Sequence, residues 1–341
     1  MAELRWNPMI RDWVMVASNR QNRPNMPKDF CPFCPPKDEE EAKLKPGIPK
    51  EYDVFKYDND FPALSQNPPE MDHPYAPDSK VYKVAPSHGK CEVILYSSDH
   101  NGKFYDLSDE HTRKLVDLWV ERFNDLSSDP DIKYIFIFEN KFGTTQPHPH
   151  GQIYGYSFVP KKIELELDSM KEEHDADGTC LFCRINREES DFGQRLICEN
   201  DSFVAYIPFF ADYVYGIYIS SKAHRSNIAE FTADERNDLG IILKQIIGMY
   251  ESLFPERKES FPYMMCMHNA PVNLNGSEYE KYAGYADYFH FHIELYPTLR
   301  AADKEQFMAS SETGCWAHCN PTAPEEKAQE MREALERFLN K

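Results

Sequence analysis

No stretch of the sequence is apolar over the roughly 18 residues that a membrane-spanning helix requires, so we expect no membrane partner. The opening segment MAELRWNPMIRDWVMVASNRQNRP also has no basic stretch followed by a long apolar run, which is the pattern of a secretory signal peptide. These two absences together predict a cytoplasmic protein.

An excess of positive charge is absent as well, because the formal net charge is −19. An acidic surface repels a phosphate backbone, so we expect no nucleic-acid partner. A small anionic substrate stays possible, since a few arginines and backbone N–H groups can serve one local site. The 341 residues, 41% of them hydrophobic and 13% aromatic, suffice for a globular protein with two domains or one doubled domain.

A disulfide scaffold is not expected either, because the nine cysteines are odd in number and no secretory signal precedes them. Two pairs have the spacing C-x-x-C, namely Cys31 with Cys34 and Cys180 with Cys183. In a cytosolic protein this spacing indicates a metal site first and a redox pair second. The redox interpretation is the weaker one, since neither pair has the strand–helix setting of a thioredoxin motif.

Apolar periodicity predicts a mixed chain of helices and strands. Residues 22–50 and 66–80 are rich in proline or polar residues and are predicted to be loops. Helical spacing occurs over 107–126, 231–253, which opens on a Thr-x-x-Glu capping signal, and 323–340. Strands are predicted at 91–97, 133–139, 150–156, 203–207, 214–220, 263–267 and 289–296.

The order of these features occurs twice. Each copy has a C-x-x-C pair, strands ending in a single histidine, a helix, a strand, and a His-x-His segment. We therefore predict an α+β fold made of a duplicated domain, with antiparallel sheets and packed helices, divided into residues 1–165 and 166–341.

Each copy supplies the donors for a tetrahedral Cys2His2 metal site. In both sites four protein ligands would fill the coordination shell of the metal and leave no position for a substrate, so the metal would be structural. The alternative is that these cysteines are buried apolar residues and the histidines lie on the surface. The predicted ligands are Cys31, Cys34, His100 and His148 in the first copy, and Cys180, Cys183, His224 and His290 in the second.

The segment FENKFGTTQPHPHGQIYGY, residues 138–156, carries the strongest chemical signal. On a strand, His148, His150 and Gln152 share one face, so His148 would reach the metal while His150 stands beside it. A neutral imidazole whose other nitrogen is bound to an acceptor can attack phosphorus and form a phosphoramidate. Gln152 could donate to a phosphoryl oxygen, and the loop residues Gly143, Thr144 and Thr145 could hold the others.

Taken alone, a His-x-His segment is more often structural, with the histidine in the core or bound to a metal. Asn140, the Gly-Thr-Thr loop, Gln152 and the doubled scaffold favour catalysis instead. We therefore predict His150 as the catalytic nucleophile.

These residues resemble the galactose-1-phosphate uridylyltransferase family, a branch of the histidine-triad superfamily, over nearly the whole chain. The resemblance lies in WVMVASNRQNRP with Arg20 and Arg23, in CPFC, in Asn59-Asp60-Phe61-Pro62-Ala63-Leu64, in Asp99-His100, in Phe138-Glu139-Asn140-Lys141 and in His148-Pro149-His150-Gly151-Gln152. It implies a duplicated histidine-triad-like fold, zinc at the metal sites and a homodimer.

The resemblance also implies a ping-pong reaction in galactose metabolism. UDP-glucose would give UMP to His150 and release glucose 1-phosphate, and galactose 1-phosphate would then take the UMP to form UDP-galactose. Asn59, Asp60 and Asn140 would surround the nucleotide, while Arg20 and Arg23 would lie near the phosphates, in one arrangement reaching in from a second subunit. Phe307 and Glu312 fall where the family contacts the hexose.

Three other functions stay open at this stage. A nucleotide-sugar phosphorylase on the same scaffold, such as an ADP-glucose phosphorylase, would pass the nucleotidyl group to phosphate. A histidine-triad hydrolase fits less well, because Gln152 stands where such enzymes have a third histidine. A zinc-stapled module that binds nucleotides without catalysis would form no covalent adduct.

Overall fold

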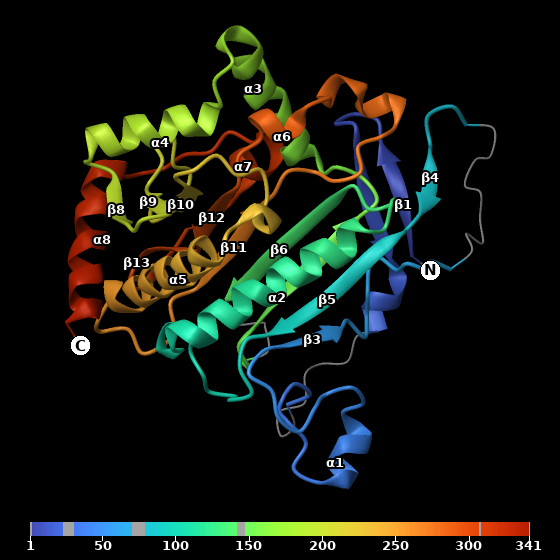
Figure 1. Ribbon diagram of the computed structural model, residues 1–341, viewed down its shortest axis with the longest axis horizontal. Helices are drawn as coiled ribbons and strands as arrows, with labels where there is room; N and C mark the ends of the chain where they lie inside the picture. The colour runs from blue at the N-terminus through green and yellow to red at the C-terminus, as the bar shows by residue number, and fades with distance from the viewer. Residues whose placement is uncertain (1, 23–30, 70–78, 142–146, 307, 341) are drawn as a thin grey trace.

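The computed structural model describes residues 2–22, 31–69, 79–141, 147–306 and 308–340. Its centre is a nine-stranded sheet in the order β3-β5-β7-β6-β11-β12-β10-β9-β8, and every neighbouring pair is antiparallel (Figure 1). The strands are β3 (Phe55–Asp58), β5 (Gly89–Leu95), β6 (Tyr134–Lys141), β7 (His150–Tyr156), β8 (Leu196–Glu199), β9 (Phe203–Tyr206), β10 (Ile217–Ser221), β11 (Tyr263–His268) and β12 (His292–Pro297).

Two smaller sheets flank the large one. The first has the order β2-β1-β4, and the second is a two-stranded hairpin. Their strands are β1 (Ala2–Asn7), β2 (Asp12–Ala17), β4 (Val84–Pro86), β13 (Leu299–Ala301) and β14 (Lys304–Glu305).

The duplication is visible in the sheet order. The first half contributes β5, β7 and β6, the second contributes β11, β12 and β10, and β6 pairs with β11 where the halves meet. In each half a long helix connects two of these strands, α2 (Asp109–Ser127) between β5 and β6 and α5 (Ala233–Leu253) between β10 and β11. The nine strands therefore form one continuous sheet across both halves.

Helices α2 and α5 lie against each other on one face of the sheet, with α8 (Pro324–Leu339) packed on α5 (Figure 1). The predicted signal at the start of α5 is a full capping box: the Thr232 side chain accepts from the backbone of Glu235, whose own side chain accepts from Thr232 N. Such a cap satisfies two backbone donors that the helix end would leave unpaired.

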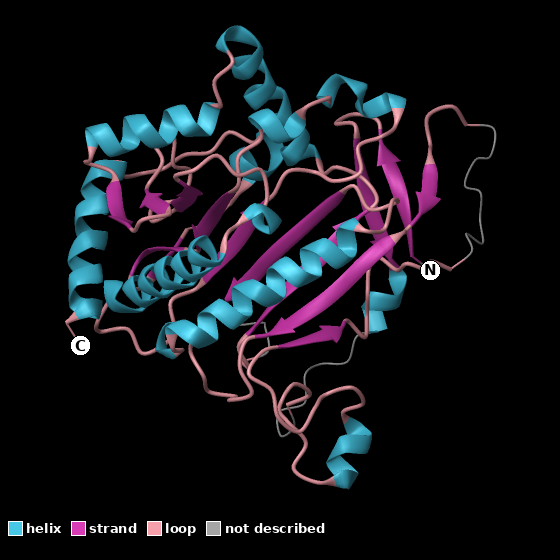
Figure 2. Cartoon of the chain, in the orientation of Figure 1, coloured by secondary structure: helices cyan, strands magenta, loops and turns pink. Residues whose placement is uncertain are grey.

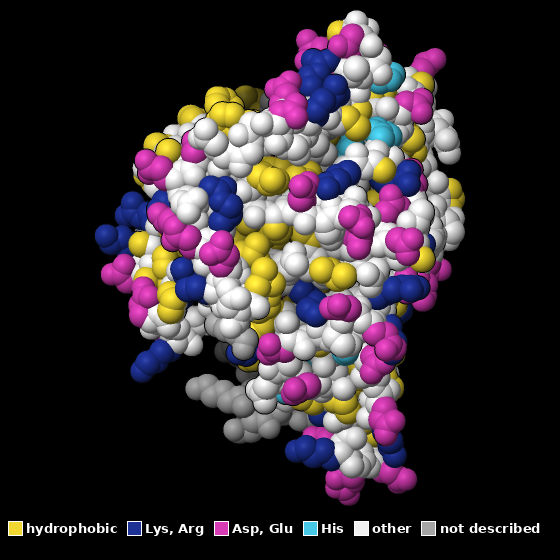
Figure 3. All heavy atoms as spheres, turned by 60° about the vertical axis from the view of Figure 1, so that its left-hand side comes forward, with side chains coloured by type: hydrophobic (Ala, Val, Ile, Leu, Met, Phe, Trp, Pro, Cys, Tyr) yellow, Lys and Arg dark blue, Asp and Glu magenta, His cyan; other side chains and the backbone are white. Residues whose placement is uncertain are grey.

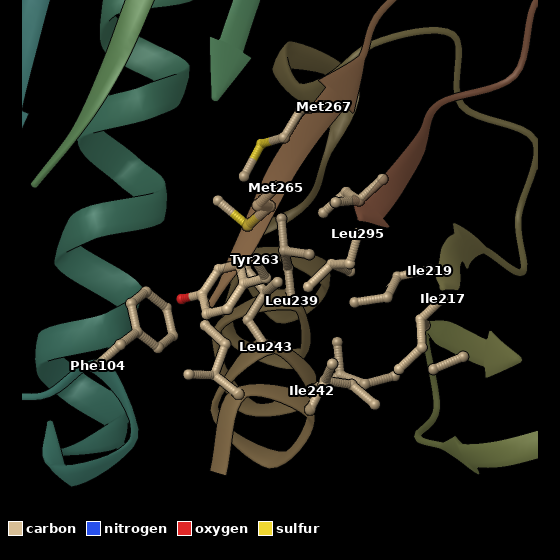
Figure 4. Close-up of a cluster of buried hydrophobic side chains, with 14 of the residues drawn as sticks. Phe104, Ile217, Ile219, Leu239, Ile242, Leu243, Tyr263, Met265, Met267 and Leu295 are labelled. Atoms are coloured by element: carbon tan, nitrogen blue, oxygen red, sulfur yellow. The ribbon is translucent and has the colours of Figure 1, made fainter. Parts of the chain in front are cut away.

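The main hydrophobic core lies between this helical layer and the sheet. Figure 4 shows Met265 and Met267 of β11 in one cluster with Leu239 and Leu243 of α5 and Leu295 of β12. All five side chains are buried. Burying side chains of this size is the main favourable term in folding.

Helices also cover parts of the opposite side of the sheet (Figure 2). A second apolar cluster there joins α3 to β6 and to the segment that precedes β12, through Leu167, Tyr134 and Phe289. The remaining helices are α1 (Glu39–Leu44), α3 (Lys161–Asp177), α4 (Leu181–Phe192), α6 (Tyr285–Tyr288) and α7 (Ser310–Cys315), with single 3-10 turns at Ser18–Asn22, Phe104–Asp106, Ile228–Glu230 and Ser277–Tyr282.

The predicted α+β class with antiparallel sheets and packed helices is confirmed. All seven predicted strands and all three predicted helices are present, with ends that shift by up to three residues. The prediction of loop throughout 22–50 is wrong over α1, which forms because the Asp38 side chain accepts from Glu41 N and caps the helix. Helices α3, α4, α6 and α7 were not predicted.

In the described residues, none of the helices is long and apolar enough to cross a membrane. Acidic and basic side chains are interspersed on the face that Figure 3 displays, around a hollow in which apolar side chains are visible.

Candidate active site and metal clusters

The first predicted metal site is assembled from four separate segments. The ligand atoms of Cys31, Cys34, His100 and His148 all lie within 4.8 Å of one another. The Cys34 sulfur is 3.4 Å from His100 Nδ1 and 3.6 Å from His148 Nδ1, and the Cys31 sulfur is 3.8 Å from His148 Nδ1. Sulfur and nitrogen ligands of a tetrahedral zinc ion lie about 3.6 Å apart, so the donor set fits such an ion in both chemistry and spacing.

The His148 ring of this cluster is neutral and oriented to bind a cation. His148 Nε2 donates to the Ser97 carbonyl at 2.7 Å, which leaves the Nδ1 lone pair toward the sulfurs. Burial lowers the pKa of His148 to about 4, so its ring is neutral at pH 7. Burial raises the pKa of the Cys34 thiol to about 11, and a bound cation would be needed to stabilise the thiolate.

The second predicted site repeats this arrangement. Cys180, Cys183, His224 and His290 also have all their ligand atoms within 4.8 Å. His290 Nδ1 is 3.4 Å from the Cys180 sulfur and 3.5 Å from that of Cys183, while its Nε2 lies 2.9 Å from the Ser221 carbonyl. His148 Nε2 makes the equivalent contact with the Ser97 carbonyl, so the two copies orient these histidines in the same way.

His150 is the first residue of β7, two residues after His148. Its Nδ1 donates to the His148 carbonyl at 2.7 Å, the backbone acceptor that a nucleophilic histidine requires. This bond fixes the proton on Nδ1, so Nε2 carries the lone pair. The Phe33 ring, from the C-x-x-C loop, lies 5.3 Å from the His150 ring and limits its movement.

A cavity of about 610 Å³ adjoins His150. Its near wall comes from the first half of the chain and its far wall from the second. The lining residues are Glu139, Asn140, Lys141, Pro147, His148, Pro149, His150, Arg257, Glu259, Ser260, Pro262, Thr298, Leu299, Asp303 and Glu305. The structure thus brings His150 and Asn140, both predicted for the site, to one cavity.

Glu139 is a buried acid on this wall that was not predicted. Tyr263 donates to its carboxylate at 3.1 Å, and burial raises the pKa of Glu139 to about 7. The near wall therefore holds a carboxyl group that changes charge close to neutral pH.

The predicted nucleotide-side residues Asn59 and Asp60 are not among the described residues that line the cavity, and Asp60 is linked to His150 only through other side chains. The Tyr57 hydroxyl donates to Asp60 at 2.7 Å, and the Tyr57 ring lies 6.3 Å from Phe33, which borders His150. Asn59 shapes the same turn, since its side chain accepts from Phe61 N at 2.9 Å.

The side chains of Gln152 and Arg20 both interact with the Tyr154 hydroxyl. The Tyr154 hydroxyl donates to Gln152 Oε1 at 3.2 Å, and Arg20 of the same chain interacts with that hydroxyl. Because Oε1 of Gln152 accepts this hydrogen bond, its amide nitrogen can donate to another acceptor.

Other predicted residues are not brought to the cavity. Glu312 lies in α7, where its carboxylate accepts from Ala309 N at 3.0 Å, and it is not among the described residues that line the cavity. The predictions for Arg23, Gly143, Thr144, Thr145 and Phe307 fall outside the described residues.

A third cluster of possible metal ligands was missed. Glu166, His268, His292 and Glu294 have ligand atoms within 4.8 Å of one another, and Lys162 donates to Glu294. The alternation of His292 and Glu294 on one strand was a signal for it. His292 occupies the place in the second copy that His150 has in the first, since its Nδ1 lies 2.9 Å from the His290 carbonyl.

This second copy of the site is closed. The Phe182 ring stacks on His292 with 4.2 Å between centroids, and His292 is only 1% exposed. Of the two equivalent histidines, His150 alone lines the described cavity.

Comparison with known structures first identifies the fold. A solved uridylyltransferase structure superimposes with a TM-score of 0.84 and is 29% identical, covering 98% of this chain and 99% of that chain. The chain therefore has the fold of the uridylyltransferases.

Sequence comparison then identifies the family. Residues 1–160 match the family described as the galactose-1-phosphate uridyl transferase N-terminal domain, and residues 166–335 match its C-terminal domain. A galactose-1-phosphate uridylyltransferase of Thermotoga maritima is 37% identical over 337 residues, covering 98% of each chain. The protein belongs to the galactose-1-phosphate uridylyltransferase family, which confirms the resemblance predicted from the sequence.

An ADP-glucose phosphorylase from Arabidopsis thaliana, solved with bound ADP-glucose, has the same fold. It is 24% identical, covers 98% of this chain and 99% of that chain, and has a TM-score of 0.69. This likeness concerns the fold alone.

Proposed function

We propose that the protein transfers UMP from UDP-glucose to galactose 1-phosphate by way of a uridylyl group on His150. The observation that carries the proposal is the 2.7 Å bond from His150 Nδ1 to the His148 carbonyl. It keeps the proton on Nδ1 and leaves Nε2 basic, on a residue that lines a cavity large enough for a nucleotide sugar. Family membership supplies the substrates.

In the first half-reaction, His150 Nε2 attacks the α-phosphorus of UDP-glucose. The new P–N bond forms as the bond to the β-phosphate oxygen breaks, and glucose 1-phosphate leaves with that electron pair. In the second, a phosphate oxygen of galactose 1-phosphate attacks the same phosphorus, the P–N bond breaks, and UDP-galactose leaves. Gln152 would donate to a non-bridging oxygen throughout, because Tyr154 orients its amide.

The two Cys2His2 clusters would hold zinc as closed structural sites. Cys31, Cys34, His100 and His148 would join the thiol loop to the start of β7, and Cys180, Cys183, His224 and His290 would do the same in the second half. Bound zinc would supply a fixed link rather than a reactive centre. The donor spacing of 3.4–3.9 Å supports this assignment.

The remaining contacts follow the same proposal. Asn59, Asp60 and Asn140 would bind the nucleotide, and Arg20, Arg23, Gly143, Thr144 and Thr145 would bind its phosphates. Phe307 and Glu312 would contact the hexose, and since Glu312 does not line the cavity of its own chain, that contact suits a homodimer. The domains would be 1–165 and 166–341, and the compartment would be the cytoplasm.

The test is covalent labelling with UDP-glucose that carries ³²P at the α-position. We expect an acid-labile, base-stable label that maps to the peptide containing His150, and no label on His150→Ala. His88→Ala is the matched control, because His88 is paired with Asp129 away from the cavity and should label normally.

An His150→Ala variant that still labels and turns over would refute the role of His150. Offering galactose 1-phosphate or inorganic phosphate to the labelled enzyme then separates a transferase from a phosphorylase. A protein that binds UDP-glucose but never takes label would be a binding module.

A further inference from the structure

Residues 35–54 form an excursion that contains α1 and projects from the body of the molecule (Figure 1). The excursion follows the thiol loop, residues 31–34, and leads into β3. None of its residues is among the described residues that line the cavity beside His150. Its buried side chains instead turn back to the thiol loop.

The excursion holds the thiol loop by two hydrogen bonds and by a shared apolar cluster. The Lys45 ammonium donates to the Cys34 carbonyl at 3.2 Å, and the Tyr52 hydroxyl donates to the Phe33 carbonyl at 2.7 Å. Ile48 lies in the same buried cluster as Phe33. Three side chains of the excursion therefore fix two consecutive residues of the loop.

Lys45 differs from the other two because its charge is buried. It is the first residue after α1, and its side chain is only 2% exposed. The Glu41 carboxylate lies 3.5 Å from the ammonium, but it also accepts from Lys37 N. An apolar residue of similar volume usually fills such a position without loss of stability, so the charge itself indicates a role.

The charge of Lys45 lies where the proposed metal cluster carries negative charge. When the cluster holds zinc, both of its cysteines are thiolates. The ammonium is bound to the backbone of Cys34 and interacts electrostatically with the thiol of the same residue. Groups that support the ligands of a metal site orient them, and their loss typically lowers metal affinity by roughly 10- to 100-fold.

The thiol loop also reaches the catalytic ring. Phe33 lies between the two cysteines, and its ring is 6.1 Å from that of His148 and 5.3 Å from that of His150. The His150 ring is thus restrained both by its bond to the His148 carbonyl and by Phe33. A shift of the loop would displace Phe33 and the metal ligands together, and would change the direction of His150 Nε2.

We propose that Lys45 is a positioning residue for the catalytic histidine. Its ammonium holds Cys34 and with it the thiol loop, which keeps the first metal cluster and the Phe33 ring in place against His150. The effect on catalysis rests on the proposed function, whereas the effect on metal affinity does not.

The first measurement is zinc affinity of the full-length protein, by competition with a chromogenic chelator. Lys45→Met keeps the length of the side chain but removes its charge and its donor. It should weaken the binding of one zinc ion per chain by roughly 10- to 100-fold and leave the other ion, in the second cluster, unchanged. Lys43→Met is the matched control, because Lys43 is exposed on the same helix and should change neither ion.

The second measurement is labelling of His150 by UDP-glucose in zinc-saturated protein. For Lys45→Met, the rate at saturating UDP-glucose should fall by roughly 10-fold, as expected for a displacement of less than 1 Å at the reacting group. The half-saturating concentration should stay unchanged, because no substrate contact is lost. Lys45→Arg keeps the charge and should recover most of both the rate and the zinc affinity.

Wild-type zinc affinity in Lys45→Met would overturn the proposal, and so would a wild-type labelling rate in the zinc-saturated variant. Weaker binding of both zinc ions would indicate a general loss of structure and would also overturn it. If the wild-type protein takes no label, the proposed function fails, and the chelator competition still decides whether Lys45 supports the metal cluster. Should Lys45→Met not fold, Lys45→Gln replaces it in both measurements.

Discussion

Gly151 lies between His150 and Gln152, and its lack of a side chain should be essential. A Cβ atom built there would lie 2.2 Å from the Tyr96 hydroxyl oxygen, 2.9 Å from ring carbon Cζ and 3.0 Å from the Phe138 carbonyl. Tyr96 is only 1% exposed and cannot swing away. Gly151→Ala should therefore lower the free energy of unfolding by about 1–3 kcal/mol, the usual cost of overpacking a core.

The same clash should impair catalysis, because β7 must shift and carry His150 with it. A displacement of about 1 Å at a reacting group costs roughly 10²-fold in rate. Urea unfolding would measure the first effect, and the rate of labelling by UDP-glucose the second. Gly155→Ala is the matched control: it lies on the same strand and would meet the Ile132 side chain at 2.8 Å, but farther from His150. It should lose stability while keeping most of the labelling rate.

A double-mutant cycle isolates the contact. Tyr96→Phe removes the nearest atom, so Gly151→Ala combined with Tyr96→Phe should recover about 1 kcal/mol of the loss. Recovery should be partial, since ring carbon Cζ remains 2.9 Å away and the Phe138 carbonyl 3.0 Å away. A Gly151→Ala variant that unfolds at the wild-type urea concentration and takes label at the wild-type rate would refute this description of the strand.

Three further predictions concern the metal clusters, the buried acid and the helix cap. Cys31→Ser should lower zinc content by about one ion per chain and reduce stability, measured by elemental analysis and thermal unfolding; exposed Cys315→Ser should do neither, and unchanged zinc would argue against the first cluster. The pKa of Glu139 is about 7 against an ordinary 4.5, so the unfolded chain releases this proton first, and stability should fall between pH 4.5 and 7 by up to about 1.4 kcal/mol per pH unit. Glu139→Gln should remove that slope in urea unfolding at successive pH values, and a persisting slope would contradict it. Thr232→Ala should cost about 1 kcal/mol by breaking the capping box of α5, as seen in urea unfolding, and no change would show that the cap is dispensable.

Periodicity predicted the main strands and the long helices because their buried faces are apolar. The same signal missed α4, whose buried positions are Phe182, Asn186 and Glu189, two of them polar. Those side chains are buried because partners outside the helix satisfy them: Arg195, six residues further along the chain, pairs with Glu189 at 2.9 Å, and the Asn186 amide donates to the distant Ser220 at 2.9 Å. Such compensation is created by tertiary contacts and leaves no local pattern.

The catalytic strand could be predicted because its chemistry is local. His148, His150 and Gln152 lie within five residues, and strand alternation relates them. Arg257 carries no such signal, since it lines the same cavity as His150 only because β11 pairs with β6. The third cluster was missed for a similar reason, because Glu166 and His268 reach His292 from α3 and β11.

The pairing of β6 with β11 joins the two halves along five residue pairs, from Lys141 with Tyr263 to Ile137 with Met267. A gene truncated after the catalytic strand would encode every residue around His150 in the first half, yet its product would expose β6 as a bare edge with open amide groups. Edges of this kind recruit other chains and lead to aggregates. A premature stop codon in the second half should therefore abolish the protein through insolubility rather than through any missing catalytic group.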